Sequence, residues 1–296
     1  MTLQTYLTEK NKLVESCLDQ WLPREDAEPA KLHQAMRYSL FAGGKRIRPI
    51  LTIAAAEAVD GDISKVLPAA TALELIHTYS LIHDDLPAMD DDDYRRGRLS
   101  NHKMFGEATA ILAGDALLTF AFELLVRESI GAGVEAEKIT FALLELSSAA
   151  GTFGMIGGQA MDLSAEGQKV NLDGLETIHK CKTGALLRAA VRIGAGVSGA
   201  NQEQLQALTS YAESLGLAFQ IKDDILDIEG DSQKLGKQAG SDLLKDKSTY
   251  PSILGLQEAK RLLNQQIDNS LQSADIFAEK GKILRDIALF VRDREF

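Results

Sequence analysis

Apolar residues recur every three or four positions along most of the chain, as in Leu73, Ile76, Tyr79 and Ile82. This spacing favours helices, and the alternating Val, Ile and Thr runs typical of strands are missing. No linker rich in Pro, Gly or Ser divides the sequence, so we expect one all-α domain over residues 1–296. The pattern predicts helices over about residues 2–21, 29–42, 49–59, 64–85, 105–129, 136–153, 172–194, 202–228, 256–272 and 275–293.

Composition and charge exclude several classes of protein. The chain has 296 residues, 45% of them hydrophobic, which is enough for one sizeable core. Its net charge of −11 argues against a nucleic-acid partner, because phosphate backbones require a basic face. No uncharged apolar run approaches the roughly 18 residues of a membrane span, and the polar start lacks the core of a signal peptide. With only two cysteines, the chain is expected to be soluble and cytoplasmic.

Two aspartate clusters carry the densest chemical signal. Residues 84–93 read DDLPAMDDDD, and residues 223–227 read DDILD. Pro87 disfavours helix at the residue before it, so the chain can turn and bring Asp90 back toward Asp84. A run of Asp is often only a solvated surface. Both clusters, however, end apolar helices, where the helix dipole disfavours negative charge, and this favours bound cations such as Mg²⁺.

Basic residues complement these carboxylates. Residues 43–49 read GGKRIRP, and residues 94–98 read YRRGR directly after the first acidic cluster. Taken alone, either segment could be an ordinary basic turn. Arginine matches phosphate oxygens with two parallel hydrogen bonds, so arginines beside carboxylates suit a polyanion that is bridged to the protein by metal.

Together the motifs resemble one family, the trans-prenyltransferases or isoprenyl diphosphate synthases. The segments that carry the resemblance occur in family order: Gly43-Gly44-Lys45-x-x-Arg48-Pro49, Asp84-Asp85-x4-Asp90, Arg95-Arg96-Gly97, Gly157-Gly158-Gln159, Lys182-Thr183-Gly184, Phe219-Gln220-x-x-Asp223-Asp224-x-x-Asp227 and Gly236-Lys237. The resemblance implies an all-α bundle of about ten or more helices around a central cavity. The two extra residues in DDLPAMD are similar to the bacterial farnesyl diphosphate synthase type. Leu99 and Ser100 depart from the usual Pro and Thr, which questions the shape of that loop.

The resemblance also implies site residues. It implies three Mg²⁺ per active site, with the ligands Asp84, Asp90 and Asp223 and with support from Asp85, Asp224 and Asp227. It implies a clamp on the allylic diphosphate from Arg95, Lys182 and Lys237. It implies a pocket for isopentenyl diphosphate from Lys45, Arg48, His77 and Arg96. Thr183 and Gln220 resemble the polar groups near the allylic cation, whereas Tyr79 and Ser80 occupy the place that sets chain length.

The activity implied is head-to-tail condensation of isopentenyl diphosphate with dimethylallyl and geranyl diphosphate, giving farnesyl diphosphate, by a homodimer. Three alternatives stay open at this point. A geranylgeranyl diphosphate synthase would use the same chemistry for a longer product. A class I terpene cyclase would ionise a single diphosphate substrate, so the basic segment GGKRIRP would have no second diphosphate to bind. A non-catalytic subunit, or an acidic metal-binding interaction protein, would be expected to lose one of the two clusters.

Overall fold

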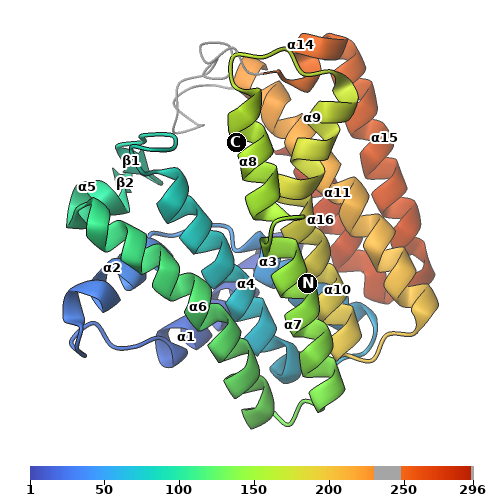
Figure 1. Ribbon diagram of the computed structural model, residues 1–296. Helices are drawn as coiled ribbons and strands as arrows, with labels where there is room; N and C mark the ends of the chain where they lie inside the picture. The colour runs from blue at the N-terminus through green and yellow to red at the C-terminus, as the bar shows by residue number, and fades with distance from the viewer. Residues whose placement is uncertain (230–247, 295–296) are drawn as a thin grey trace. The chain divides into compact units, whose positions relative to one another are not determined.

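The computed structural model describes residues 1–229 and 248–294, which are almost entirely helical (Figure 1). The chain forms two compact units: residues 1–53 with 63–143, and residues 54–62 with the chain from residue 144 onward. The prediction of an all-α fold is confirmed. The single-domain organisation and the central cavity stay predictions.

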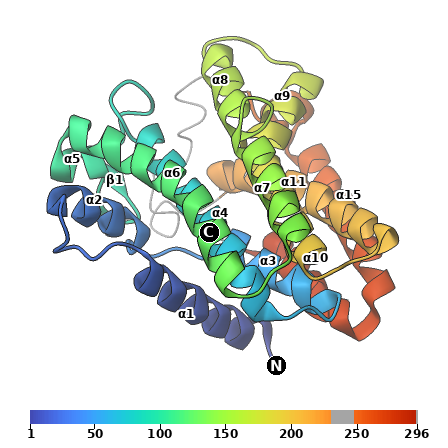
Figure 2. The same ribbon diagram turned by 60° about the horizontal axis from the view of Figure 1, so that its bottom comes forward.

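The first unit is built around one buried helix, α4 (Ile63–Asp84). Between Val66 and Ile82 most of its side chains are buried, as expected of a helix that is apolar on all sides. Helix α6 (Glu107–Gly131) runs beside it in both views (Figure 1, Figure 2). The unit also contains α1 (Leu3–Trp21), α2 (Ala30–Leu40), β1 (Tyr94–Arg95), β2 (Arg98–Leu99) and α5 (Asn101–Phe105). Helices α3 (Ile47–Ala58) and α7 (Ala136–Ala150) are shared between the units.

The second unit packs around α11 (Gln202–Glu229), which lies against α10 and α15 (Figure 1). Tyr211 on α11 is fully buried and donates a hydrogen bond of 2.7 Å to the carbonyl of Leu284. The remaining elements are α8 (Met155–Ala165), α9 (Leu172–His179), the π-helix η1 (Lys180–Gly184), α10 (Ala185–Val197), α14 (Tyr250–Leu254), α15 (Leu256–Ala274), the 3₁₀-helix η2 (Asp275–Gly281) and α16 (Lys282–Asp293).

The observed helices differ from the prediction in several places, including the unpredicted α5 and α14 and the 3₁₀-helix η2 within predicted 275–293. The predicted helix 172–194 is interrupted by η1, because a five-residue π-turn leaves no mark on apolar spacing. Helix α8 was not predicted, since Gly157 and Gly158 lower its helix propensity. Helix α4 begins at Ile63 and ends at Asp84, one residue before each end of the predicted range 64–85.

Two segments, Glu107–Gly131 and Ala136–Ala165, are long and apolar enough to cross a membrane by length and composition. Helices from the core of water-soluble proteins pass the same test, so two such segments are weak evidence for a membrane protein. Several large apolar side chains on α6 are exposed, among them Leu112 at 57% and Ile130 at 64%.

Candidate functional site

The residues predicted from the motifs divide between the two units, and each set is described by itself. The first unit holds Lys45, Arg48, His77, Tyr79, Ser80, Asp84, Asp90, Arg95 and Arg96. The second unit holds Lys182, Thr183, Gln220 and Asp223. Lys237 lies outside the described residues.

The first acidic motif folds back on itself. Asp84 is the last residue of α4, and the amide of Asp90 donates a hydrogen bond of 2.9 Å to the carbonyl of Asp84. Between them, the amide of Met89 donates to the carbonyl of Leu86 at 2.9 Å. The predicted return of Asp90 toward Asp84 is therefore confirmed at the level of the backbone. Their carboxylates start from neighbouring positions at the negative end of a helix, where a cation is favoured.

Asp85 is the buried member of this motif, with its side chain 3% exposed. It accepts two hydrogen bonds from Arg95, one from Nε at 2.9 Å and one from Nη2. Burial raises the pKa of Asp85, and the Arg95 guanidinium opposes that shift. Arg95 also lies 3.4 Å from Asp92. Asp85 therefore orients Arg95, a role that differs from the metal support that the resemblance implies.

Arg95 and Arg96 lie on a short hairpin formed by β1 and β2. Arg96 and Gly97 occupy its turn with φ of 54° and 76°, the left-handed conformation that a tight two-residue hairpin requires. The usual proline is absent at Leu99, yet the loop is tied down. The carbonyl of Leu99 accepts a hydrogen bond of 2.9 Å from Tyr38, and buried Asn101 donates one of 2.8 Å to the carbonyl of Ala35. These bonds hold the loop without a proline.

The basic loop 43–49 receives this hairpin. Gly44 has φ of 135°, and a Cβ there would lie 2.7 Å from Cζ of Arg96. Arg96 donates to the carbonyl of Gly43. Any side chain at Gly44 would push the guanidinium away, so glycine is required for the close approach of Arg96 to the loop. Lys45 is exposed and Arg48 is half-buried.

His77 on α4 lies among the charges of Arg48 and Arg96, and we use the name basic pocket for the predicted set Lys45, Arg48, His77 and Arg96. Burial first, and then the charges of Arg48 and Arg96, hold the pKa of His77 well below its ordinary value. Burial lowers the pKa of Arg48 to about 10. The imidazole is therefore neutral near pH 7, and the pocket combines a neutral donor with permanent positive charge. Such a pocket suits a phosphorylated ligand.

The two predicted chain-length residues follow directly on α4. The Tyr79 ring is buried and packs edge-on against His83, with ring centroids 5.8 Å apart. Its hydroxyl is buried and makes no hydrogen bond within the described residues, and burial raises its pKa to about 12. Ser80 is half-buried and donates to the carbonyl of His77 at 2.9 Å. Both residues lie within two turns of Asp84.

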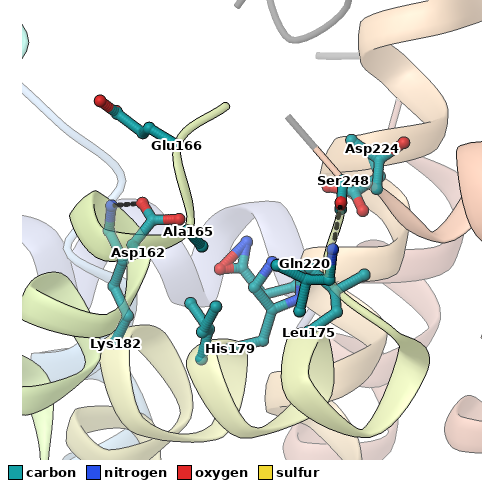
Figure 3. Close-up of a pocket in the computed structure, with 12 residues that line it drawn as sticks. Asp162, Ala165, Glu166, Leu175, His179, Lys182, Gln220, Asp224 and Ser248 are labelled. Carbon is teal, nitrogen blue, oxygen red and sulfur yellow. Dashed lines mark hydrogen bonds and ion pairs between the residues drawn. The ribbon is translucent and has the colours of Figure 1, made fainter. Parts of the chain in front are cut away.

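In the second unit, predicted residues line a pocket of about 190 Å³ (Figure 3). Lys182, in the π-helix η1, reaches into it and donates to Asp162 of α8 at 2.6 Å (Figure 3). A Cβ on Gly158 would lie 2.2 Å from the amide nitrogen of Lys182, so this glycine lets α8 approach the backbone of η1. The Gly-Gly-Gln motif thus positions the lysine.

Gln220 on α11 lines the same pocket (Figure 3). Its side-chain oxygen accepts a hydrogen bond from the Thr183 hydroxyl, and its amide nitrogen lies 3.5 Å from Asp223. Asp224 is buried and accepts from the amide of Tyr250 at 2.9 Å, whereas Asp223 stays half-exposed. The structure therefore brings the predicted residues of this unit into one connected group.

The C-terminal tail ends against this group. Arg294, whose side chain is 7% exposed, donates to Asp223 at 2.6 Å and to the carbonyl of Phe219 at 3.0 Å. Its guanidinium also lies over the Phe219 ring, 4.0 Å from the centroid. The sequence left the role of the tail open, and the structure shows that its arginine is the ion-pair partner of a predicted metal ligand.

Sequence reasoning missed Arg294 and Asp162, and it read Asp85 only as metal support. Asp162 lies four residues after Gly158 on α8, hence on the same helix face, which was the available signal. For Arg294 there was none, because its partner lies 71 residues away.

The predicted carboxylate ligands suit Mg²⁺ that binds together with substrate, and not a metal ion held by protein side chains alone. Among the described residues, no three His, Cys, Asp or Glu side chains gather closely enough to hold a metal ion by themselves. Mg²⁺ usually binds through one or two carboxylates plus substrate phosphates and waters. The fold-back of Asp90 onto Asp84 therefore suits a cation that binds together with a diphosphate.

Comparison with known proteins agrees with this chemistry. The profile of the family described as polyprenyl synthetase matches residues 29–286. The chain is 48% identical to the farnesyl diphosphate synthase of Geobacillus stearothermophilus over 93% of both sequences. It is 49% identical to a chloroplastic heterodimeric geranylgeranyl pyrophosphate synthase large subunit of Arabidopsis thaliana, covering 98% of this chain and 79% of the relative. A crystal structure of a geranyltransferase from Legionella pneumophila superposes with a TM-score of 0.88 at 33% identity, over 99% of this chain and 97% of the other.

The depressed pKa of His77 predicts a pH effect on stability. Below the ordinary value of 6.5 the unfolded chain binds a proton that the folded His77 refuses, so this contribution to stability is lost as pH falls. His77→Gln removes that proton uptake. We expect the drop in melting temperature between about pH 7.5 and about pH 5.5 to be smaller in the variant than in the parent. An equal drop in both proteins would contradict the neutral, buried imidazole.

Proposed function

Because the chain belongs to the polyprenyl synthetase family, we propose that it is a (2E,6E)-farnesyl diphosphate synthase. It joins isopentenyl diphosphate to dimethylallyl diphosphate and then to geranyl diphosphate, 1′-4 and head to tail, releasing diphosphate each time. The observation that carries the proposal is the basic pocket of Arg48, His77 and Arg96 in the same unit as the acidic turn from Asp84 to Asp90. Two phosphate-handling elements suit two diphosphate substrates.

Isopentenyl diphosphate occupies the basic pocket. Arg48 and Arg96 hold the phosphates by charge and paired hydrogen bonds, and exposed Lys45 adds a further positive charge. Neutral His77 donates a hydrogen bond to a phosphate oxygen without adding charge. The pocket fixes the double bond of this substrate relative to the allylic carbon, and such positioning accounts for much of the catalysis.

The family resemblance assigns the allylic diphosphate to Arg95, Lys182 and Lys237, of which Lys237 lies outside the described residues. Asp84 and Asp90 would hold two Mg²⁺ ions, and Asp223 would hold a third. The metal, when bound, supplies Lewis-acid stabilisation of the charge that develops on the departing diphosphate. Asp85 keeps Arg95 oriented, and Asp162 does the same for Lys182.

The bond from C1 of the allylic substrate to oxygen breaks, and the isopentenyl double bond attacks that carbon. The oxygens of Thr183 and Gln220, tied together by their hydrogen bond, stabilise the positive charge on the allylic carbon. The product forms when the adduct loses a proton to the released diphosphate. Buried side chains such as Tyr79 exclude the water that would otherwise capture the cation.

The alternatives are separable by substrate and product. A geranylgeranyl diphosphate synthase is favoured by the Arabidopsis relative at 49% identity and would give a longer product from the same substrates. A terpene cyclase would react without isopentenyl diphosphate and would not need the basic pocket. A non-catalytic subunit would bind diphosphates without turnover.

We place the enzyme in the cytoplasm as a soluble homodimer. The exposed apolar residues of α6, including Ile111, Leu112 and Ile130, form the surface on which a second copy would pack. Its partners in the reaction are small diphosphates, in keeping with a net charge of −11 that disfavours nucleic acid.

The deciding experiment incubates the purified protein with Mg²⁺, isopentenyl diphosphate and either dimethylallyl or geranyl diphosphate. We expect farnesol as the main alcohol after dephosphorylation and chromatography. Geranylgeraniol would favour the longer product instead. A cyclic hydrocarbon formed without isopentenyl diphosphate would identify a cyclase. If no product of either kind forms, the alternative of a non-catalytic subunit would be favoured.

Loss of a metal-binding carboxylate tests the acidic turn. Asp84→Asn keeps the shape of the side chain but removes its charge, so we expect turnover to fall roughly 10³-fold, equivalent to about 4 kcal/mol of transition-state stabilisation. Steady-state kinetics measures the fall, and circular dichroism checks the fold. Asp91→Asn is the matched control, because Asp91 is exposed and its left-handed backbone tolerates Asn. Near-parental turnover in folded Asp84→Asn would contradict the metal assignment.

Tyr79 tests the setting of product length. Tyr79→Ala removes the ring from the buried position on α4 before Asp84, leaving space for a longer tail. We expect products longer than fifteen carbons by chromatography, whereas Tyr79→Phe keeps the ring and the parental product. Farnesol alone from folded Tyr79→Ala would show that another residue ends the tail.

A further inference from the structure

The basic loop contains two arginines, Arg46 and Arg48, and the structure gives them different tasks. Arg46 is fully buried, with its side chain 0% exposed. It donates to Glu74 at 2.7 Å and also to the carbonyl of Leu40. The Nε atoms of Arg46 and Arg48 are both buried without a hydrogen bond, but the side chain of Arg48, unlike that of Arg46, has no hydrogen-bond or ion-pair partner within the described part of the chain. Arg46 is therefore committed to protein partners, whereas Arg48 keeps donors for a ligand.

Glu74 is the carboxylate at the centre of this arrangement. Its side chain is 2% exposed on α4, one turn before His77 on the same face of the helix. Besides the ion pair with Arg46, its negative charge acts on Arg48 and Arg96 of the basic pocket. A buried carboxylate among several arginines partly offsets their mutual repulsion.

The ion pair also fixes the backbone of the loop. Arg46 has φ of 47°, a left-handed conformation that is costly for a residue with a side chain. Its carbonyl accepts the amide of Ile50 at 3.0 Å in the first turn of α3. Lys45 precedes this kink and Arg48 follows it by two residues. Holding Arg46 in place thus determines where both pocket residues lie relative to His77.

We propose that Glu74 is a positioning residue for isopentenyl diphosphate: it anchors Arg46, and through it the loop that presents Lys45 and Arg48. The inference rests on the proposed function for the identity of the ligand. It differs from a simple counterion role in the sign of its effect. Removing a counterion beside an anion site strengthens anion binding, whereas removing an anchor weakens it.

The test measures binding of isopentenyl diphosphate by calorimetry in EDTA, with KM for both substrates in Mg²⁺. We expect Glu74→Gln to weaken the binding of isopentenyl diphosphate roughly tenfold or more. The KM for geranyl diphosphate should stay within about twofold of the parental value. The double variant Glu74→Gln with Arg46→Met should weaken the binding of isopentenyl diphosphate no further than either single variant, because both substitutions remove the same ion pair. Glu145→Gln is the control, since it alters another partly buried ion pair, with Arg192 at 2.8 Å, in the second unit.

Unchanged or tighter binding by folded Glu74→Gln would overturn the proposal. If that variant does not fold, Arg46→Lys keeps the charge but loses the two-pronged contact. The same rise in KM for isopentenyl diphosphate is then expected, and an unchanged KM overturns the proposal. A parent protein that binds isopentenyl diphosphate but makes no farnesyl diphosphate would refute the proposed function and leave the anchor standing. A parent protein that does not bind isopentenyl diphosphate would refute the proposal that Glu74 positions the loop for this ligand.

Discussion

The first unit holds several arginines and a histidine close together in one partly buried pocket, and its fold depends on balancing their positive charges. Two like charges about 4 Å apart repel by about 4 kcal/mol near a protein surface, so such a pocket disfavours folding unless carboxylates offset it. Glu74 and Asp85 do so from buried positions, at Arg46 and Arg95 respectively. The compensation is incomplete at Arg48 and Arg96, and that surplus of positive charge suits an anionic ligand.

The acidic motifs present the opposite problem, because they collect negative charge where a helix dipole already disfavours it. The two motifs meet it differently. In the first, Asp85 takes Arg95 as its partner, and the chain turns after α4 so that Asp90 returns to Asp84. In the second, Arg294 pairs with Asp223. In both, an arginine from another segment holds one carboxylate of the motif.

Glycine enables the close approaches that these contacts need. Gly44 admits the guanidinium of Arg96, and Gly158 admits the backbone of Lys182. In each unit a glycine of a family motif therefore makes room for a predicted substrate-binding residue. The π-helix η1 serves the same end, since it carries Lys182 and Thr183 toward the pocket that Gln220 also lines.

The sequence by itself determined the helical class, most helix ranges and the return of Asp90 to Asp84, because apolar spacing and the effect of Pro87 are local. Its motifs also led to the family that the comparisons show. Only the tertiary structure distinguished Arg46 from Arg48, and only it paired Lys182 with Asp162 and Arg294 with Asp223. Arg46 and Arg48 are the same residue type and have nearly the same neighbours in sequence. Which one is consumed by a buried carboxylate depends on a residue 28 positions away on another helix, which local pattern does not encode.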